Sequence, residues 1–319
     1  MAEDGGGVVV IGAGMAGLAC ARRLADAGLR PLVLDKGRGI GGRLATRRAT
    51  LPVGAVTFDH GAQYLTVRDP GFVGVIDALA AQGVAAQWKG GDRPRWVGTP
   101  GMSALPRALA HGLEVRQGVE VRAIRRGDTG WTVHTDTEVV SARAVVATVP
   151  APQVAALVGT DHALVPGLAE VRLAPCLTLM AAFAADTPRA FDAEARDDDP
   201  LAWIACDATK PGRPAAAQTW VAQAAPDWSA RYLEDDRPAI ADRMLPLLAA
   251  RLGLSAGDVL HAAAHRWRYA RVTAPLGQPF LHDRGLWLGG DWCLGARVEA
   301  AWISGTAIAN DLLERADVA

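Results

Sequence analysis

The 319-residue chain is predicted to be an α/β protein in which a domain built on a parallel sheet is joined to a second, α+β domain built on an antiparallel sheet. Two observations predict this. The first 35 residues alternate strand, helix and strand, as in a parallel βαβ unit, whereas strand-like runs between about residues 152 and 261 lack that alternation. The length also exceeds the usual range of about 100–200 residues for one domain. Half of the residues are apolar, which suffices for a large core.

The first unit carries a phosphate-binding loop. Val8–Ile11 reads as a short buried strand, and it runs into a GxGxxG loop that opens a helix predicted over residues 15–27. Glycine supplies the tight turn, lets the backbone approach a pyrophosphate and lets the helix pack on the strand. The N-terminal N–H groups of the helix favour phosphate. A Rossmann-like dinucleotide site is therefore predicted at Gly12, Ala13, Gly14, Met15, Ala16 and Gly17.

The second predicted strand, residues 31–35, ends in an acid. Asp35 lies 18 positions after Gly17 (35 − 17), where a carboxylate accepts hydrogen bonds from a ribose diol. Its charge disfavours an NADP 2′-phosphate. Residues 36–43 then resemble the stretch that follows this acid in amine-oxidase-like flavoproteins, which favours FAD over NAD, although a basic surface loop is the alternative. Arg43 can pair with phosphate through its planar fork of donors, and Lys36 and Gly42 join it in the predicted site.

The C-terminal part resembles the segment with which flavoproteins close over the ribityl chain and flavin ring. Residues 286–291 lead through residues 297–301 to Ser304 and Gly305. Asp291 is expected to accept a hydrogen bond from a ribityl hydroxyl. A helix beginning near Val298 would point its N–H groups at the flavin N1/C2 carbonyl, where negative charge develops on reduction. This segment adds Gly290, Asp291, Arg297, Val298 and Ala301 to the predicted cofactor site.

Further motifs make the resemblance more specific. They look like the renalase-type (bacterial) branch of the flavin-containing amine oxidase superfamily, and they occur in order at residues 35–43, 58–66, 101–105, 220–221 with 228–229, and 265–270. The resemblance implies an amine-oxidase-like topology. It also implies that Val121 lies over the adenine and that Gly61, Ala62, Gln63 and Thr148 lie near the cofactor. Cys293 falls outside the motif in which some relatives form a flavin thioether, so we expect noncovalent FAD and a packing role for this cysteine.

The predicted domains are both discontinuous. The FAD-binding domain is placed at residues 1–71, 97–151 and 270–319, and the substrate-binding domain at residues 72–96 and 152–269. The other expected elements are helices over 72–82 and 102–111, strands over 118–124, 131–135, 138–140, 144–149, 177–183, 201–206 and 218–223, and a loop over 94–100. Asp235 or Asp236 can cap a helix that begins near Pro238, with a kink expected at Pro246.

The substrate face is expected where the second sheet meets the flavin. If residues 265–269 form a strand, His265, Trp267 and Tyr269 point to one face and Arg266 and Arg268 to the other. The first face suits a flat nicotinamide, and the arginines could meet dinucleotide phosphates; a core Trp267 with arginines in solvent is the alternative. Tyr64 could equally be a buried tyrosine whose hydroxyl bonds to the backbone. The pocket candidates are His60, Gln63, Tyr64, His265, Arg266, Trp267 and Trp292.

The resemblance implies a reaction. Renalase-like enzymes oxidise misreduced isomers of NAD(P)H, which carry hydride at ring position 2 or 6, by hydride transfer to flavin N5 and reoxidation by O2 to H2O2. No catalytic acid or base is required, because a dihydropyridine gives up hydride without losing a proton. A flavin-dependent amine oxidase is the alternative enzyme, and a non-catalytic FAD-binding redox sensor or scaffold is the alternative outside enzymes. The sequence contains no paired-carboxylate site, Ser-His-Asp signature or metal cluster.

Composition excludes several partners. The net charge of −1 and a pI near 6.7 show no surplus of basic residues with which to bind nucleic acid or an anionic membrane. Val8–Cys20 is apolar, but an export signal needs a basic start, whereas Glu3 and Asp4 precede this segment. No apolar stretch approaches about 20 residues, so no transmembrane helix is expected. The four cysteines lack metal or disulfide spacing. We expect a cytoplasmic enzyme that acts on a small molecule and O2.

Overall fold

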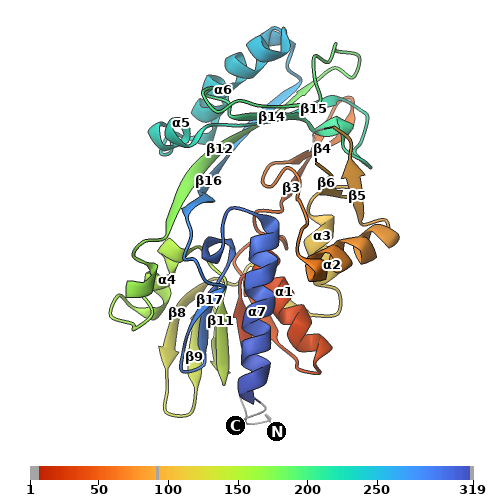
Figure 1. Ribbon diagram of the computed structural model, residues 1–319. Coiled ribbons are helices and arrows are strands. Elements are labelled where there is room, and N and C mark those ends of the chain that lie inside the picture. Colours follow the sequence, from red (N-terminus) through yellow and green to blue (C-terminus); the bar gives the residue numbers. More distant parts are fainter. Residues whose placement is uncertain (1–6, 91–92, 317–319) are drawn as a thin grey trace.

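The computed structural model describes residues 7–90 and 93–316, so Glu3 and Asp4 lie outside the described residues. Two sheets organise the chain (Figure 1). A parallel sheet with helices α1 and α7 forms the lower half of the view, and an antiparallel sheet with helices α5 and α6 forms the upper half. The long strands β12 and β16 run from one half to the other, which confirms the predicted α/β architecture with a second, antiparallel sheet.

The larger sheet has six strands in the order β17-β18-β11-β1-β2-β7, and all but the edge strand β17 are parallel. Its strands are β1 (Val8–Ile11), β2 (Leu32–Asp35), β7 (Glu114–Gln117), β11 (Ala144–Ala147), β17 (Phe280–Asp283) and β18 (Leu286–Gly289). Every residue of β1, β11 and β18 is buried, as in a parallel sheet covered on both faces. The carboxyl ends of the parallel strands form one edge, where ligands of such sheets bind.

Two layers cover this sheet. Helices α1 (Met15–Asp26) and α7 (Val298–Ala316) lie on one face and share a hydrophobic cluster with Val10, Val33 and Val146. The other face packs against α4 (Ala151–Val158) and a three-stranded sheet of β8 (Val121–Arg126), β9 (Trp131–Thr135) and β10 (Val139–Ala142). The strand predicted over 118–124 is present as β8 but begins three residues later, at Val121. A separate strand, β7, ends at Gln117, and Gly118 turns between the two with φ +72°. The sequence shows no strand pattern for β7, because this strand lies at the edge of the sheet and is mostly exposed.

The antiparallel sheet has the order β13-β14-β15-β12-β16. Its strands are β12 (Arg172–Phe183), β13 (Ala193–Ala195), β14 (Trp203–Cys206), β15 (Gln218–Gln223) and β16 (His261–Ala274). One face packs on α5 (Pro226–Arg231) and α6 (Arg237–Leu252). The opposite face, which we call the inner face, is partly covered by the hairpin of β3 (Thr46–Leu51) and β4 (Gly54–Asp59). Asp236 caps α6 as predicted, and this helix continues through Pro246.

The segment between the two halves corrects one prediction. It contains α2 (Pro70–Ala81), β5 (Ala85–Trp88), β6 (Arg95–Gly98) and α3 (Ala104–Leu109). A loop is predicted over 94–100. In the structure β6 occupies part of this range and pairs with β5 in an antiparallel hairpin, with Trp88 opposite Arg95. Phe72, Ile76 and Leu79 of α2 pack in the same hydrophobic cluster as α1 and α7. The placement of residues 72–96 in the substrate-binding domain stays a prediction.

Four short 3-10 helices complete the described chain: Pro166–Leu168, Asp207–Thr209, Ala256–Asp258 and Asp291–Cys293. Across residues 7–90 and 93–316, no helix combines the length and the apolar character that crossing a membrane requires.

Candidate active site

The predicted phosphate-binding loop has the backbone geometry that its glycines allow. Gly12 has φ +106°, and a Cβ on Gly17 would lie 1.9 Å from the Gly12 carbonyl oxygen, so α1 can meet the loop this closely only without a side chain. A Cβ on Gly14, in contrast, would meet no atom within 4 Å. The first turn of α1 has no acidic residue and Gly14 provides no side-chain cap. The backbone beside Gly14 therefore has room and free N–H groups for a phosphate.

Asp35 and Thr148 hold the loop at the carboxyl edge of the sheet. The Asp35 carboxylate accepts hydrogen bonds from Ala13 N and Gly37 N, both at 2.6 Å. The Thr148 hydroxyl donates to Ile11 O at 2.9 Å. Each carboxylate oxygen of Asp35 keeps a further lone pair, so the residue can still accept from a ribose diol.

Arg43 and Asp291 lie together at this edge although they are 248 positions apart. Arg43 donates to both carboxylate oxygens of Asp291, at 2.8 and 2.6 Å, and to Ala270 O at 2.9 Å. The motifs predict separate partners for these two residues, a phosphate for Arg43 and a ribityl hydroxyl for Asp291. The structure joins them in a bidentate pair that ties the loop after β2 to the segment after β18.

The other cofactor candidates lie around this pair or near it. Ala62 N donates to Arg43 O at 2.8 Å, and a Cβ on Gly61 would lie 2.0 Å from that same oxygen. Gly42, at φ +54°, faces Gly14 Cα. Of the remaining candidates, Lys36 is exposed at the end of β2, Val121 is buried at the start of β8, Gly290 has φ +153°, and Arg297, Val298 and Ala301 begin or precede α7.

Three predicted residues form an aromatic cluster between the two sheets. The ring centroids of His60 and His265 are 4.8 Å apart, and those of His265 and Trp267 are 4.3 Å apart. Trp267 Nε1 donates to His60 O at 2.8 Å. Burial lowers the pKa of both imidazoles to about 4, with nearby Arg47 adding to the shift of His60 and His60 adding to that of His265. Both rings are therefore neutral at pH 7.

The inner face adds residues that the sequence analysis missed. Strand register places Trp203, Gln223, Thr178 and His265 opposite one another on four adjacent strands, and we call these four residues the inner row. Gln223 Nε2 donates to the carbonyl oxygen of Gly61, one of the predicted cofactor residues, at 2.7 Å. None of the four side chains is an acid, a lysine or an arginine. A polar Thr178 in an apolar strand was the one signal in the sequence.

Arg266 and Arg268 point to the other side of β16, as alternation predicts, and there they meet acidic groups. Arg268 pairs with both carboxylate oxygens of Glu234, at 2.7 and 2.9 Å, and Arg266 Nη1 lies 3.6 Å from the same carboxylate. Arg266 also donates to Asp235 O at 2.6 Å. The hypothesis that this pair meets substrate phosphates is therefore corrected: both arginines lie on the α5–α6 side of the sheet.

Tyr64 lies at the opposite end of the inner row. Its ring centroid is 5.5 Å from that of Trp203. The guanidinium carbon of Arg95 lies 5.1 Å from the Tyr64 ring, 5.4 Å from the Trp203 ring and 5.6 Å from the Trp88 ring. We call these four residues the Arg95 cluster.

Comparisons with known proteins agree with this geometry. Residues 10–78 match the model of an NAD(P)-binding Rossmann-like domain, and residues 86–313 match the model of flavin containing amine oxidoreductases. The chain belongs to the flavin containing amine oxidoreductase family. It is thus a flavin-dependent oxidoreductase, and the predicted fold and enzyme class are confirmed.

Solved structures share the fold over nearly the whole chain. A putative protoporphyrinogen oxidase from Exiguobacterium sp. 255-15 gives a TM-score of 0.76 at 14% identity, covering 96% of this chain and 98% of that chain. A double mutant of putrescine oxidase gives 0.73 at 14% identity, with 97% and 99% covered. Cyclohexylamine oxidase from Brevibacterium oxydans IH-35A gives 0.72 at 13% identity, with 98% and 99% covered.

The described residues fit a flavin nucleotide. The backbone beside Gly14 accommodates a phosphate, and three buried polar atoms between the sheets have no hydrogen-bond partner among residues 7–90 and 93–316. These atoms are His60 Nδ1, His265 Nδ1 and Trp203 Nε1. Buried polar atoms without partners cost free energy, and such atoms occur where a ligand binds.

Gln63 is turned into the protein by a buried charge cluster that the sequence analysis missed. Its amide donates to Asp59 O and Gly61 O, and its oxygen accepts from Lys210 Nζ at 3.3 Å. Lys210 also lies 2.5 Å from Asp207, and Arg213 pairs with Asp59. Burial would raise the pKa of Asp59, but Lys210 and Arg213 outweigh it and lower that pKa. The Gln63 side chain is therefore occupied by Asp59, Gly61 and Lys210, and its contact with the cofactor stays a prediction.

Trp292 and Cys293 lie in the core. Trp292 is 1% exposed, and its Nε1 donates to Val149 O at 3.0 Å, so the expected substrate contact does not match its placement. Cys293 is fully buried, and burial raises the pKa of its thiol to about 12. A buried, protonated thiol fits the predicted packing role.

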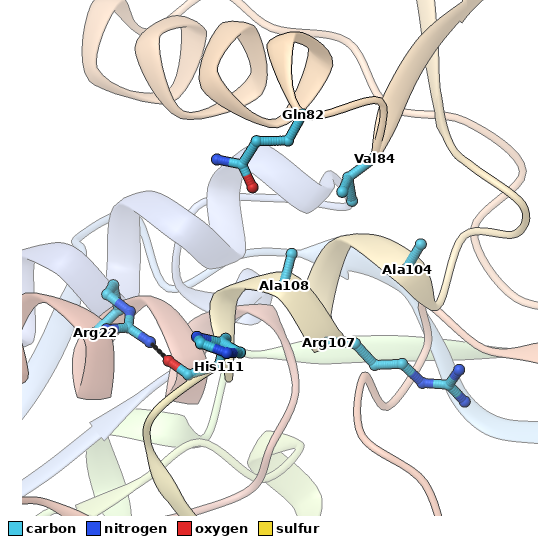
Figure 2. A pocket seen from close by; sticks show the side chains of 7 residues that line it. All are labelled: Arg22, Gln82, Val84, Ala104, Arg107, Ala108 and His111. Carbon is cyan, nitrogen blue, oxygen red and sulfur yellow. Dashed lines mark hydrogen bonds between the residues drawn. The ribbon is translucent and has the colours of Figure 1, made fainter.

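A separate hollow of about 680 Å³ lies on the outer surface (Figure 2). Arg22, which lines it, donates to the carbonyl oxygens of Leu109 and His111, and Arg107 extends away from Arg22 in this view. Arg22 is seven residues beyond Met15, roughly 10 Å along α1 from the phosphate loop. The side chains do not converge, and this hollow is not part of the flavin site. The others that line it are Gln82, Val84, Ala104 and Ala108.

Proposed function

We propose that this chain binds FAD noncovalently and oxidises misreduced NAD(P)H isomers, which carry hydride at nicotinamide ring position 2 or 6, with O2 as acceptor and H2O2 as product. The single observation that carries the proposal is the uncharged inner row. Its members His265, Thr178 and Gln223 carry no formal charge, and His60 and Trp267 lie next to them. When bound, the flavin supplies a hydride acceptor at N5.

The cluster of His60, His265 and Trp267 suits a flat dihydropyridine. The indole and the two imidazoles give an aromatic surface, and Gln223, two strands from His265, offers a polar side chain toward the edge of a carboxamide-bearing ring. The task of these residues is to align the ring and exclude water. None of them has to move a proton, because loss of hydride alone makes the nicotinamide ring aromatic.

The same face is poorly suited to an amine. An alkylamine is protonated at neutral pH and must lose a proton before oxidation. The inner row has no carboxylate to hold an ammonium group, and imidazoles with a pKa of about 4 are weak bases at pH 7. We therefore place the nicotinamide isomers ahead of amines as substrates.

Helix α7 can favour the reduced flavin. Its positive end lies at the carboxyl edge, where a negative charge on the flavin would be stabilised. Glu299 in the first turn would oppose this effect, but Arg297 pairs with it at 2.8 Å and the N–H groups of Arg68 and Asp69 donate to it. These contacts compensate the charge of Glu299, so the positive end of the helix dipole can still act on the cofactor.

Noncovalent FAD has a direct test. The purified protein is expected to be yellow and to release intact FAD after acid or heat treatment, because the Cys293 thiol is buried and protonated. Flavin that stays with the precipitated protein would contradict the noncovalent assignment. Release of FMN instead of FAD would contradict the dinucleotide assignment.

The substrate is tested by anaerobic stopped-flow absorbance. The 2- and 6-dihydro isomers of NADH and a panel of primary and secondary amines are mixed with the holoenzyme, and flavin bleaching is followed. We expect rapid bleaching with the nicotinamide isomers and slow or no bleaching with amines. Rapid bleaching by amines alone would overturn the proposal in favour of an amine oxidase. No bleaching by any of them would favour a non-catalytic role.

A further inference from the structure

A small hollow of about 60 Å³ lies apart from the inner face, between the β3–β4 hairpin and the chain around α3. Arg48 lines it from the hairpin and Arg107 from α3, and among the described residues that line it none is acidic. A hollow of this size holds about four water molecules, since one water needs roughly 10–15 Å³. Its volume is therefore comparable to that of a tetrahedral oxyanion such as phosphate.

Strand register places two consecutive arginines of β3 on opposite faces of the hairpin. Arg48 lies opposite Thr57 of β4, whereas Arg47 lies opposite Phe58. Cross-strand partners share a face, and successive residues of a strand alternate between faces. Phe58 packs in the cluster on the inner face of the antiparallel sheet. Arg47 therefore points to that side, and Arg48 points to the opposite side, where the small hollow lies.

Arg107 supplies a second guanidinium group. Its side chain extends away from Arg22 and from the larger outer hollow (Figure 2), and it is exposed, as is the side chain of Arg48. Two guanidinium groups that line one small hollow repel each other, and an anion between them would replace this repulsion with attraction. Each group also presents the planar fork of N–H donors that fits a phosphate.

The hairpin adds a hydroxyl group to the two cations. Thr57 lines the hollow, and its Oγ1 is buried without a hydrogen-bond partner among residues 7–90 and 93–316. Rotation about the Cα–Cβ bond can turn this hydroxyl toward a ligand in the hollow, where it would gain the hydrogen bond that it lacks. The hydroxyl of Thr46, which also lines the hollow, is already used, because it donates to Asp59 and accepts from Ser103 N.

We propose that Arg48, Arg107 and Thr57 form a binding site for a tetrahedral oxyanion, either inorganic phosphate or the phosphate group of a larger ligand. The two arginines bind the anion through charge-assisted hydrogen bonds, and the threonine hydroxyl donates a third. The bound anion ties β3 to α3 beside the hairpin whose last residue, Asp59, precedes His60. The site is separate from the inner face, so it does not depend on which substrate reduces the flavin.

The test is a calorimetric titration of the holoenzyme, in which the flavin already occupies the phosphate-binding loop. Inorganic phosphate and adenosine 5′-monophosphate are titrated separately at constant ionic strength. Arg48→Met and Arg107→Met each remove one guanidinium group, and Thr57→Val removes the hydroxyl with little change of shape. Arg47→Met is the matched control, because it removes the same charge from the other face of the same strand. Flavin content and circular dichroism confirm that each variant is folded.

We expect saturable phosphate binding that is weakened about tenfold or more by Arg48→Met and by Arg107→Met. Thr57→Val should weaken it a few-fold, and Arg47→Met should leave it unchanged. With this dependence on the two arginines, tighter binding of the monophosphate ester would identify the phosphate of a larger ligand, and equal or weaker binding would identify the free ion. If the wild-type protein binds neither ligand, if binding survives in Arg48→Met or Arg107→Met, or if Arg47→Met loses as much affinity as they do, the inference is overturned.

Discussion

The two halves of the candidate site are built in opposite ways. At the carboxyl edge of the parallel sheet, residues 12–17 act mainly through backbone N–H groups and through the missing side chains of Gly14 and Gly17. On the inner face of the antiparallel sheet, four strands each contribute one side chain to the row. The first half is a local structure, whereas the second exists only when distant strands pair. This difference decides what a substitution does in each half.

The sharpest contrast lies within the phosphate loop itself. Gly17→Ala places a Cβ 1.9 Å from the Gly12 carbonyl oxygen, so α1 must move from the sheet, at a cost of about 3 kcal/mol or more in unfolding free energy. Gly14→Val puts its side chain into open space along the expected path of the pyrophosphate. It should therefore leave the unfolding midpoint of the apoprotein near that of wild type and abolish flavin binding.

Chemical denaturation of apoprotein and flavin titration of both variants check this pair. Full flavin occupancy in Gly14→Val would show that the cofactor phosphates bind elsewhere. A stable Gly17→Ala protein with normal flavin binding would mean that the close contact between α1 and the loop is not required.

The sequence predicted the Rossmann-like unit of the first half for a physical reason. A tight turn, a close backbone approach and the start of a helix all require particular residues at fixed spacings, so the glycine loop at residues 12–17 and the strand end at Asp35 could be located without any tertiary information, while their contacts with a cofactor stay predictions. No fixed spacing of residues in the sequence predicts the inner face. Thr178, Gln223 and Trp203 become neighbours only through strand register, and Arg266 and Arg268 could be assigned a face but not a partner. The partner, Glu234, lies in a loop that no periodicity places.

The next prediction concerns the buried charges that join the two halves. Lys210→Met leaves Asp207 and Asp59 with Arg213 as their remaining cation, and breaking a buried ion pair in this way costs about 3–5 kcal/mol. The urea midpoint should fall strongly, and the loop that carries Gln63 should lose its support. Arg315→Met is the matched control, because it breaks an exposed pair with Asp311 and should change the midpoint little. Equal effects of the two substitutions would mean that the buried cluster is not a structural support.

A third prediction separates cofactor binding from substrate alignment. His265→Ala removes a side chain from the inner row and leaves the phosphate loop untouched, so FAD should remain bound. Flavin reduction by the dihydronicotinamide isomers should slow by roughly tenfold to a few hundredfold. The substitution removes a group that positions the ring, and it does not remove a group that transfers a proton. Anaerobic stopped-flow gives the limiting rate and the apparent dissociation constant. An unchanged rate would mean that the substrate ring binds away from His265, nearer to the Arg95 cluster that includes Tyr64.

The smallest expected effect is the part of the pH dependence of stability that comes from His60 and His265. The pKa values of His60 and His265 are about 4 in the folded protein, below the ordinary value of 6.5. Between pH 6.5 and about 4 the unfolded chain therefore binds protons that the folded chain does not, so the unfolding free energy falls as pH falls through this window and is unaffected by these groups above it. By pH 5 the loss should be on the order of 1–2 kcal/mol for the better buried His60, and less for the more exposed His265. Urea titrations at pH 7.5, 6 and 5 measure it, and His60→Asn should flatten the profile while retaining its neutral polarity. A His60→Asn profile as steep as that of wild type would assign the acid sensitivity to other groups and would remove the support for a neutral imidazole on the inner face.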